Sequence, residues 1–272
     1  MSMVNFEEAL DVAIAAAHDA GKILRDRFAR HCAESGDADL DVRSKGSPRE
    51  LVTEVDALAQ RAIVDRILQT YPDHRFIGEE EGAADLGNPH SPFAWIIDPL
   101  DGTMNFVRRK SGIGTLIALQ ENGETKLGVM LLPLHGQLFT GIRGQGAFLN
   151  GAPITLRHTI GIADSILCTN GSKRARPCKG GALHISLPVC ASLQNYGNAA
   201  EEMGEILLGH NDGVFYEGVG LWDVAAGCLL IEEAGGKSRT ELINERNPWA
   251  GVNCIASTKE IFEELSEFMF KQ

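Results

Sequence analysis

The spacing of hydrophobic residues changes along the chain. Between residues 5 and 30 apolar side chains recur at close to helical spacing, which predicts a long amphipathic helix. A second helix is predicted from Val52 to Thr70 because the helical period resumes there and stops before Pro72. The intervening residues 36–49 are rich in Asp, Ser and Gly, which is typical of an exposed loop.

From residue 76 the period shortens to that of strands, with short apolar runs separated by turn residues such as Asn122-Gly123. This pattern predicts a largely antiparallel sheet. Beyond Pro153 strand-like and helix-like segments alternate, which predicts an α/β second half. We therefore expect an α+β domain over residues 1–153 and an α/β domain over 154–272. The expected strands are 75–78, 93–97, 114–119, 127–132, 137–141, 165–169, 214–216 and 252–256, and the later helices are 199–208, 222–234 and one at the C-terminus.

Composition indicates a folded globular protein, because 44% of the 272 residues are hydrophobic. No run approaches the roughly 20 apolar residues of a membrane span, and the N-terminus lacks the order of a secretory signal. We therefore expect a cytoplasmic protein without membrane association. The six cysteines form no CxxC pair, which predicts reduced thiols rather than a zinc site or disulfide framework.

The net charge of −12 opposes binding to nucleic acid or to an anionic membrane. An acidic protein that handled phosphate would need metal cations to mediate the contact. A phosphate site in this protein would therefore be expected to contain carboxylates that hold such cations.

The segment 95–106, WIIDPLDGTMNF, is the most informative one. An apolar strand leads to Asp98, and Asp101 follows a turn stiffened by Pro99, so both carboxylates can face one point. Such oxygen ligands suit Mg²⁺, and the carbonyl of Leu100 is a further candidate ligand. The amides of the next two residues could bind a phosphate oxygen. The alternative is a simple turn, because Asp, Pro and Gly are common turn residues.

Two further acidic stretches strengthen the first interpretation. Residues 78–81, GEEE, end a predicted strand, and adjacent carboxylates repel one another unless a cation or solvent accommodates them. Asp223 follows Trp222 at the start of an apolar helix, where it could also serve only the helix dipole.

Taken in order, LVTEVDALAQ, GEE, WIIDPLDGTMNF and WDVAAGCLLIEEAGG closely resemble motifs of the inositol monophosphatase family, within a superfamily of lithium-sensitive, metal-dependent phosphatases. The resemblance extends from about residue 6 to residue 260. It implies the five-layer αβαβα sandwich of inositol monophosphatase and fructose-1,6-bisphosphatase. It also implies a homodimer and lithium inhibition.

The resemblance implies how the site would work. Two to three Mg²⁺ ions would be held by Glu79, Asp98, the Leu100 carbonyl, Asp101 and Asp223. The backbone amides of Gly102 and Thr103 would bind the phosphate. A water activated by the metals would attack phosphorus, with Glu79 and the Thr103 hydroxyl, oriented by Asp56, available to accept its proton.

Substrate residues are also implied by the resemblance. They are Lys45, Gly197, Asn198, Ala199, Glu217 and Asp223, with Glu217 accepting hydrogen bonds from polyol hydroxyls. The chain departs from many relatives by having Asn198 in place of Ser or Thr and Gln194 in place of Arg. Loss of that arginine weakens the case for a substrate with a second phosphate there, and leaves inositol itself uncertain.

The resulting hypothesis is Mg²⁺-dependent hydrolysis of a small phosphorylated polyol or alcohol, with inositol monophosphate as the first candidate. Histidinol phosphate and fructose 1,6-bisphosphate are the enzymatic alternatives, because the same metal chemistry serves them. A non-enzymatic scaffold that senses metal or phosphate is the third. It predicts a damaged set of site residues, whereas Glu79, Asp98, Asp101, Thr103 and Asp223 are all present.

Overall fold

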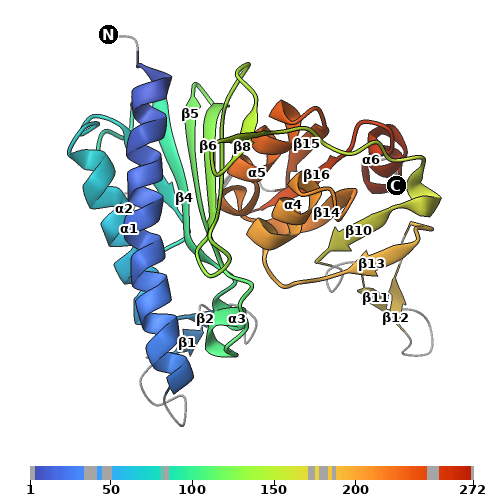
Figure 1. Ribbon diagram of the computed structural model, residues 1–272, viewed down its shortest axis with the longest axis horizontal. Helices are drawn as coiled ribbons and strands as arrows, with labels where there is room; N and C mark the ends of the chain where they lie inside the picture. Colours follow the sequence, from blue (N-terminus) through green and yellow to red (C-terminus); the bar gives the residue numbers. More distant parts are fainter. Residues whose placement is uncertain are drawn as a thin grey trace.

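The computed structural model describes residues 4–33, 42–44, 51–80, 82, 86–170, 175–177, 183–185, 188–243 and 251–270. Its helices and sheets form five layers in the order helices, sheet, helices, sheet, helix (Figure 1). The first layer consists of α1 (Phe6–Ala33) and α2 (Glu54–Leu68), which pack against each other and against one face of the larger sheet. The layered architecture expected from the sequence is confirmed.

The larger sheet has seven strands in sequential order, so each strand pairs with its neighbour in the chain. Only the first pair is parallel, and the rest are antiparallel. Asn122 and Gly123 both have positive φ, as the tight turn between the third and fourth strands requires. The strands are β3 (Arg75–Gly78), β4 (Phe93–Asp101), β5 (Gly114–Glu121), β6 (Glu124–Leu132), β7 (Gln137–Ile142), β8 (Ala147–Leu149) and β9 (Ala152–Ile154).

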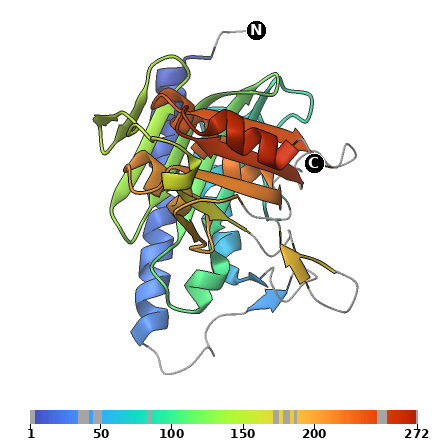
Figure 2. The same ribbon diagram turned by 90° about the vertical axis from the view of Figure 1, so that its right-hand side faces the viewer.

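The second sheet has five strands and mixed pairing, in the order β13-β10-β14-β16-β15. Three of its strands run parallel, and β16 and β15 add antiparallel pairs at one side. The C-terminal helix α6 (Phe262–Phe270) covers its outer face and forms the fifth layer (Figure 2). The strands are β10 (Ile166–Thr169), β13 (Ser192–Gln194), β14 (Gly213–Val219), β15 (Lys237–Leu242) and β16 (Val252–Ser257).

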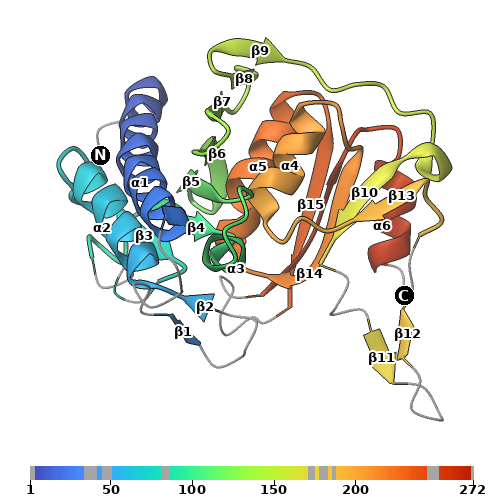
Figure 3. The same cartoon turned by 60° about the horizontal axis from the view of Figure 1, so that its bottom comes forward.

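Between the two sheets lie α4 (Ala199–Leu207) and α5 (Leu221–Glu233), side by side (Figure 3). Strand β4 is buried throughout because both faces of its sheet are covered. Trp95 and Ile97 face α1 and α2, whereas Ala94 and Ile96 face the α4–α5 layer. A strand buried on both sides has no polar face, which is why this one is continuously apolar before Asp98.

Smaller elements complete the fold. They are a hairpin of β1 (Arg43–Ser44) and β2 (Leu51–Val52), a hairpin of β11 (Ala175–Pro177) and β12 (Leu183–Ile185) that projects from the body in Figure 3, the short helix α3 (Thr103–Val107), and the 3-10 turn Ile162–Asp164.

The predicted helices and strands are all present, with ends shifted by a few residues. The sequence patterns missed the mostly exposed β15 and a set of short elements, which are α3, β1, β2, β8, β9, β11, β12, β13 and the 3-10 turn; β1 lies within the segment predicted to be a loop. The division of the chain at residue 153 stays a prediction, and this position lies inside β9. Most of the expected loop 36–49 lies outside the described residues. Among the described helices, none has the length and apolarity to cross a membrane.

Candidate active site

The end of β4 brings two acidic side chains into the protein interior. Asp98 is 1% exposed and Asp101 is 8% exposed. The pairing of β4 with β5 is interrupted between them, so the strand bulges at Pro99 and Leu100 instead of alternating regularly. The Asp98 carboxylate accepts a hydrogen bond from the Leu100 amide at 3.1 Å. The turn anticipated from the sequence is therefore an irregular strand end.

Gly102 links this strand end to α3 with a φ of +92°. A side chain at this position would be strained in φ, and its Cβ would lie 2.8 Å from the Gly112 carbonyl oxygen. Glycine is thus required by both backbone conformation and space, and α3 begins at the next residue.

A buried hydrogen-bond network joins α2 to α3. Asp56 is fully buried and accepts bonds from the Thr53 amide at 2.8 Å and the Thr53 hydroxyl at 2.6 Å. Its other oxygen lies 2.8 Å from the Thr103 hydroxyl, which also lies 3.2 Å from the Leu100 carbonyl. The predicted contact between Asp56 and Thr103 is present. Burial raises the pKa of Asp56, and the bonds from Thr53 and Thr103 partly offset this.

Glu79 follows β3, the strand parallel to β4, so both strands deliver acidic residues to the same end of the sheet. The Glu79 amide donates to the Ile97 carbonyl at 3.1 Å. Gln60 on α2 then exchanges two hydrogen bonds with the backbone of Glu80, at 3.1 and 3.2 Å. These bonds fix the acidic segment against α2.

Two acids meet across the boundary between the larger sheet and the middle helices. The Asp101 carboxylate accepts a hydrogen bond from the Ala200 amide of α4 at 2.5 Å. The Asp223 carboxylate, at the start of α5, accepts one from the Gly220 amide at 2.8 Å. The N-termini of α4 and α5 therefore point toward the end of β4, where their dipoles favour negative charge.

Burial and mutual repulsion destabilise the ionised forms of the buried acids in this cluster. The pKa of Asp98 is raised well above its ordinary value, first by burial and then by repulsion from Glu79, Asp101 and Asp223 and by a hydrogen bond with Glu79. Burial and the charge of Asp223 likewise raise the pKa of Asp101, although the Ala200 amide opposes this. Each charged neighbour that shifts these two groups is another carboxylate.

This donor set fits a hard cation. Within the described residues neither Asp98 nor Asp101 forms an ion pair with Lys or Arg, so no described cation neutralises them. Clustered carboxylate and carbonyl oxygens are the ligands that Mg²⁺ selects. In the described part of the chain, however, no three His, Cys, Asp or Glu side chains stand ready around one metal position.

A polar cleft of about 330 Å³ adjoins the acids. It contains the predicted substrate residues Gly197, Asn198 and Ala199, whereas Glu217 is not among its lining residues. Lys45 lies outside the described residues. The cleft is lined by Asp101, Asn170, Asn195, Gly197, Asn198, Ala199, Glu202, Tyr216, Val219 and Asp223.

Sequence reasoning missed the side chains that hold this cleft in shape. Glu202 is 3% exposed and accepts bonds from the Tyr216 hydroxyl at 2.5 Å and the Tyr196 amide at 2.7 Å. Asn105 donates to the Gly112 and Tyr196 carbonyls, both at 2.8 Å. A Glu on the apolar face of α4 was the available signal, because a buried carboxylate needs partners.

Comparison with known proteins agrees with this fold. The model of the inositol monophosphatase family matches residues 5–267. Over 254 residues the chain is 34% identical to inositol-1-monophosphatase of Bacillus subtilis, covering 90% of this chain and 94% of that one. It is 35% identical over 230 residues to the protein named Nus factor SuhB of Pasteurella multocida, with 84% and 83% covered. The chain belongs to the inositol monophosphatase family.

Solved structures share the architecture. The inositol monophosphatase of Anabaena (Nostoc) sp. PCC 7120 superposes with a TM-score of 0.77 at 27% identity, covering 98% of this chain and 97% of that one. The family and fold expected from the motifs are thereby confirmed. The family includes proteins named as enzymes and proteins named as a factor, so the activity has to be argued from the site.

Proposed function

We propose that this protein is a Mg²⁺-dependent phosphatase that hydrolyses a small phosphorylated polyol, with inositol monophosphate as its substrate. The observation that carries the proposal is the convergence of Glu79, Asp98, Asp101 and Asp223 from three regions of the chain, with no described cation opposing the two buried aspartates. Such mutual repulsion costs stability unless a metal compensates it. Membership of the inositol monophosphatase family supports the same reaction.

The ligand set proposed for two to three Mg²⁺ ions is Glu79, Asp98, the Leu100 carbonyl, Asp101 and Asp223. When bound, the ions would neutralise phosphoryl charge and help to position the reacting oxygens. Support comes from a solved structure of the same fold, an IMPase/NADP phosphatase that is complexed with Mg²⁺ and phosphate and is 22% identical to this chain. We infer lithium sensitivity from the family alone.

Thr103 and Asp56 would manage the proton of the attacking water. The Asp56 carboxylate accepts a hydrogen bond from the Thr103 hydroxyl, with the two oxygens 2.8 Å apart, so the Thr103 oxygen keeps a lone pair directed away from Asp56. It can therefore accept a hydrogen bond from the water and orient it, and Glu79 is the second proposed acceptor. The Gly102 and Thr103 amides would bind a phosphate oxygen at the start of α3.

The substrate alcohol would occupy the cleft beside Asp101 and Asp223. The asparagine side chains that line this cleft, Asn170, Asn195 and Asn198, are hydrogen-bonded to neighbouring groups of the protein and so give the cleft a fixed polar wall, which suits a hydroxylated ligand better than an apolar one. Gly197, Asn198, Ala199 and Glu217 are the proposed contacts, together with Lys45 for anionic charge. Glu217 is held by reciprocal bonds between its backbone and the Asn170 side chain at 2.8 and 3.1 Å.

The decisive experiment is phosphate release from inositol 1-phosphate, histidinol phosphate, fructose 1,6-bisphosphate and a nucleotide monophosphate, with Mg²⁺ and with EDTA. We expect turnover that requires Mg²⁺ and is fastest with inositol 1-phosphate. Equal turnover of histidinol phosphate would remove the proposed substrate but retain the reaction class. No Mg²⁺-dependent turnover of any of them would favour the non-enzymatic scaffold.

Assembly and location complete the proposal. We infer a cytoplasmic homodimer, and sedimentation at micromolar concentration would show a single species of twice the chain mass. The net charge of −12 opposes direct contact with nucleic acid. Retention on immobilised RNA or DNA at physiological salt would contradict this part of the proposal.

A further inference from the structure

Two thiols lie together behind the candidate active site. The sulfur atoms of Cys228 on α5 and Cys254 on β16 are 3.5 Å apart, and both cysteines are free. Cys254 is fully buried and Cys228 is 8% exposed. The two cysteines are 26 positions apart in the sequence and β15 lies between them, so the contact is tertiary and not a consequence of sequence proximity. The sequence pattern, which lacks CxxC, gave no sign of this pair.

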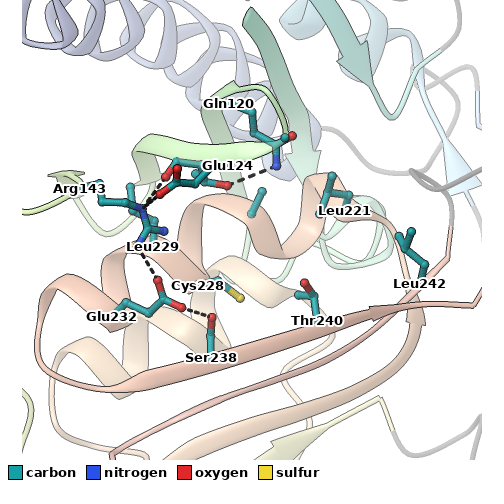
Figure 4. Close-up of a pocket in the computed structure, with 13 residues that line it drawn as sticks. Gln120, Glu124, Arg143, Leu221, Cys228, Leu229, Glu232, Ser238, Thr240 and Leu242 are labelled. Atoms are coloured by element: carbon teal, nitrogen blue, oxygen red, sulfur yellow. Dashed lines mark hydrogen bonds and ion pairs between the residues drawn. The ribbon is translucent and has the colours of Figure 1, made fainter. Parts of the chain in front are cut away.

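A cleft of about 430 Å³ leads to one of the two thiols. Cys228 is a lining residue, together with Gln120 from β5, Arg143 from the turn after β7 and Thr240 from β15 (Figure 4). The Arg143 guanidinium is paired with Glu232 at 3.0 Å, so the cleft does not present a free cation to an anionic ligand. Cys254 does not line the cleft. A small neutral oxidant can thus reach Cys228 and not its partner.

We propose that Cys228 and Cys254 form a reversible disulfide when a hydroperoxide enters this cleft. The Cys228 thiolate attacks one peroxide oxygen, the O–O bond breaks, and the product is a sulfenic acid with hydroxide or alkoxide released. The Cys254 sulfur then attacks the Cys228 sulfur, its proton leaves with the sulfenic hydroxyl as water, and the S–S bond forms. Two thiols lose two electrons, and the hydroperoxide is reduced to an alcohol and water.

The order of these steps follows from the surroundings. The hydrogen bond with Cys228 and then burial raise the pKa of Cys254 well above its ordinary value, so Cys254 keeps its proton until the sulfenic acid has formed. The sulfurs must approach from 3.5 Å to about 2.05 Å, which a small shift of α5 on β16 can supply.

The disulfide between Cys228 and Cys254 would link α5, which carries Asp223, to β16, which pairs with a strand of the substrate cleft. Asp223 lies on α5, little more than one helical turn before Cys228. Cys254 is the β16 partner of Tyr216, whose hydroxyl donates to Glu202 in the substrate cleft. Shifting α5 on β16 therefore moves Asp223 relative to the cleft wall. This consequence rests on the proposed function, whereas disulfide formation does not.

The test uses full-length protein with Cys32, Cys178 and Cys190 replaced by serine, which leaves the two thiols of the pair and Cys168. After hydrogen peroxide, we expect loss of both thiols of the pair on alkylation under denaturing conditions and a cross-linked peptide that is two hydrogens lighter. Dithiothreitol should restore both thiols. Cys228→Ala and Cys254→Ala should each abolish the cross-link. Cys168→Ala, which removes an equally buried thiol hydrogen-bonded to Asn211, should retain it.

Two results would overturn the assignment: both thiols remaining free after peroxide, or sulfinic acid at Cys228 without a cross-link. Phosphate release is measured on the same samples. We expect a several-fold loss on oxidation that dithiothreitol reverses and that Cys228→Ala does not show. A cross-link with unchanged turnover would refute the coupling to Asp223. A cross-link in protein that never releases phosphate would retain the disulfide and refute the proposed function alone.

Discussion

Asp98 and Asp212 are both almost completely buried, yet their surroundings differ in kind. Asp212 accepts the Thr159 hydroxyl at 2.7 Å and the Ile166 amide at 2.8 Å, and the Arg157 guanidinium lies 3.4 Å away. Asp98 is hydrogen-bonded to the nearby Leu100 amide, and its charged neighbours are other carboxylates.

The difference separates a carboxylate that is paired with hydrogen-bond donors and a cation of the protein, Asp212, from one that we propose as a metal ligand, Asp98. A buried charge with hydrogen-bond donors and a cation stabilises its surroundings, because removing it leaves those partners unpaired. A buried charge among like charges lowers the free energy of unfolding until a cation arrives. Both aspartates are buried, so burial does not distinguish them. The sign of the neighbouring charges distinguishes them.

The largest effect is expected from Asp98→Asn. The amide is nearly the same size but is a poor ligand for Mg²⁺, so phosphate release should fall about a thousandfold or more, equivalent to about 4 kcal/mol. Initial rates at saturating Mg²⁺ test this. Without divalent ions the variant should unfold at the same or higher urea concentration than the wild type, because one repelling charge is gone. Undiminished Mg²⁺-dependent turnover would refute the assignment of this residue.

Asp212→Asn should show the opposite pattern. Replacing a buried carboxylate that is paired with Arg157 and two donors is expected to lower the free energy of unfolding by about 3 kcal/mol. Turnover per folded molecule should not change, because Asp212 lies outside the candidate active site. Urea unfolding monitored by tryptophan fluorescence measures the first quantity. Loss of turnover with normal stability would break the distinction between the two aspartates.

Thr103 tests whether the network around a third buried carboxylate, Asp56, serves catalysis or only packing. Thr103→Val keeps the shape and removes the hydroxyl, so we expect phosphate release to fall about a hundredfold. Thr103→Ser keeps the hydroxyl and should stay within a few-fold of the wild type. A large loss in Thr103→Ser together with little loss in Thr103→Val would indicate that the threonine methyl group, and not the hydroxyl, matters.

The sequence predicted the layers well because hydrophobic period reports which faces are buried. The apolar run at residues 93–97 identified the strand β4, and Asn122-Gly123 identified the tight turn between β5 and β6. The short strands β8, β9 and β13 escaped because three residues carry no measurable period. The mostly exposed β15 escaped because its burial pattern has no apolar face.

The sequence identified candidate site residues that form an unusual local pattern. It did not identify residues whose hydrogen-bond partners are distant in the sequence. Two acids three positions apart, directly after an apolar run, identified Asp98 and Asp101 as candidates, and the family motif identified Asp223 as another. Gln60 and Glu202 were missed because two of their partners, the backbone of Glu80 and the Tyr216 hydroxyl, become neighbours only in the folded chain. Pairings made by tertiary structure leave no spacing signal in a single sequence.

His74 extends the comparison to a buried group that is neutral. Burial lowers its pKa from 6.5 to about 4, and the Trp95 indole N–H donates to its Nδ1 at 3.1 Å, so the protonated ring would lose this bond. His74 takes up a proton near pH 6.5 in the unfolded chain but only near pH 4 in the folded one. Its contribution to the free energy of unfolding is therefore fully present above pH 6.5 and is lost as the pH falls toward 4. We expect a loss of about 2 kcal/mol across this window.

The raised pKa values of Asp98 and Asp101 act with the opposite sign, because these acids lose repulsion as they become protonated. His74→Gln separates the two contributions: it retains an acceptor for Trp95 but cannot be protonated. Urea unfolding of both proteins without divalent ions, at several pH values between about 7 and 4, should show stability falling more steeply in the wild type. If the free energy of unfolding depended on pH equally in both proteins, His74 would be protonated within the fold as readily as in the unfolded chain. Burial beside β4 would then not oppose a charge on His74, in contrast to its effect on Asp98.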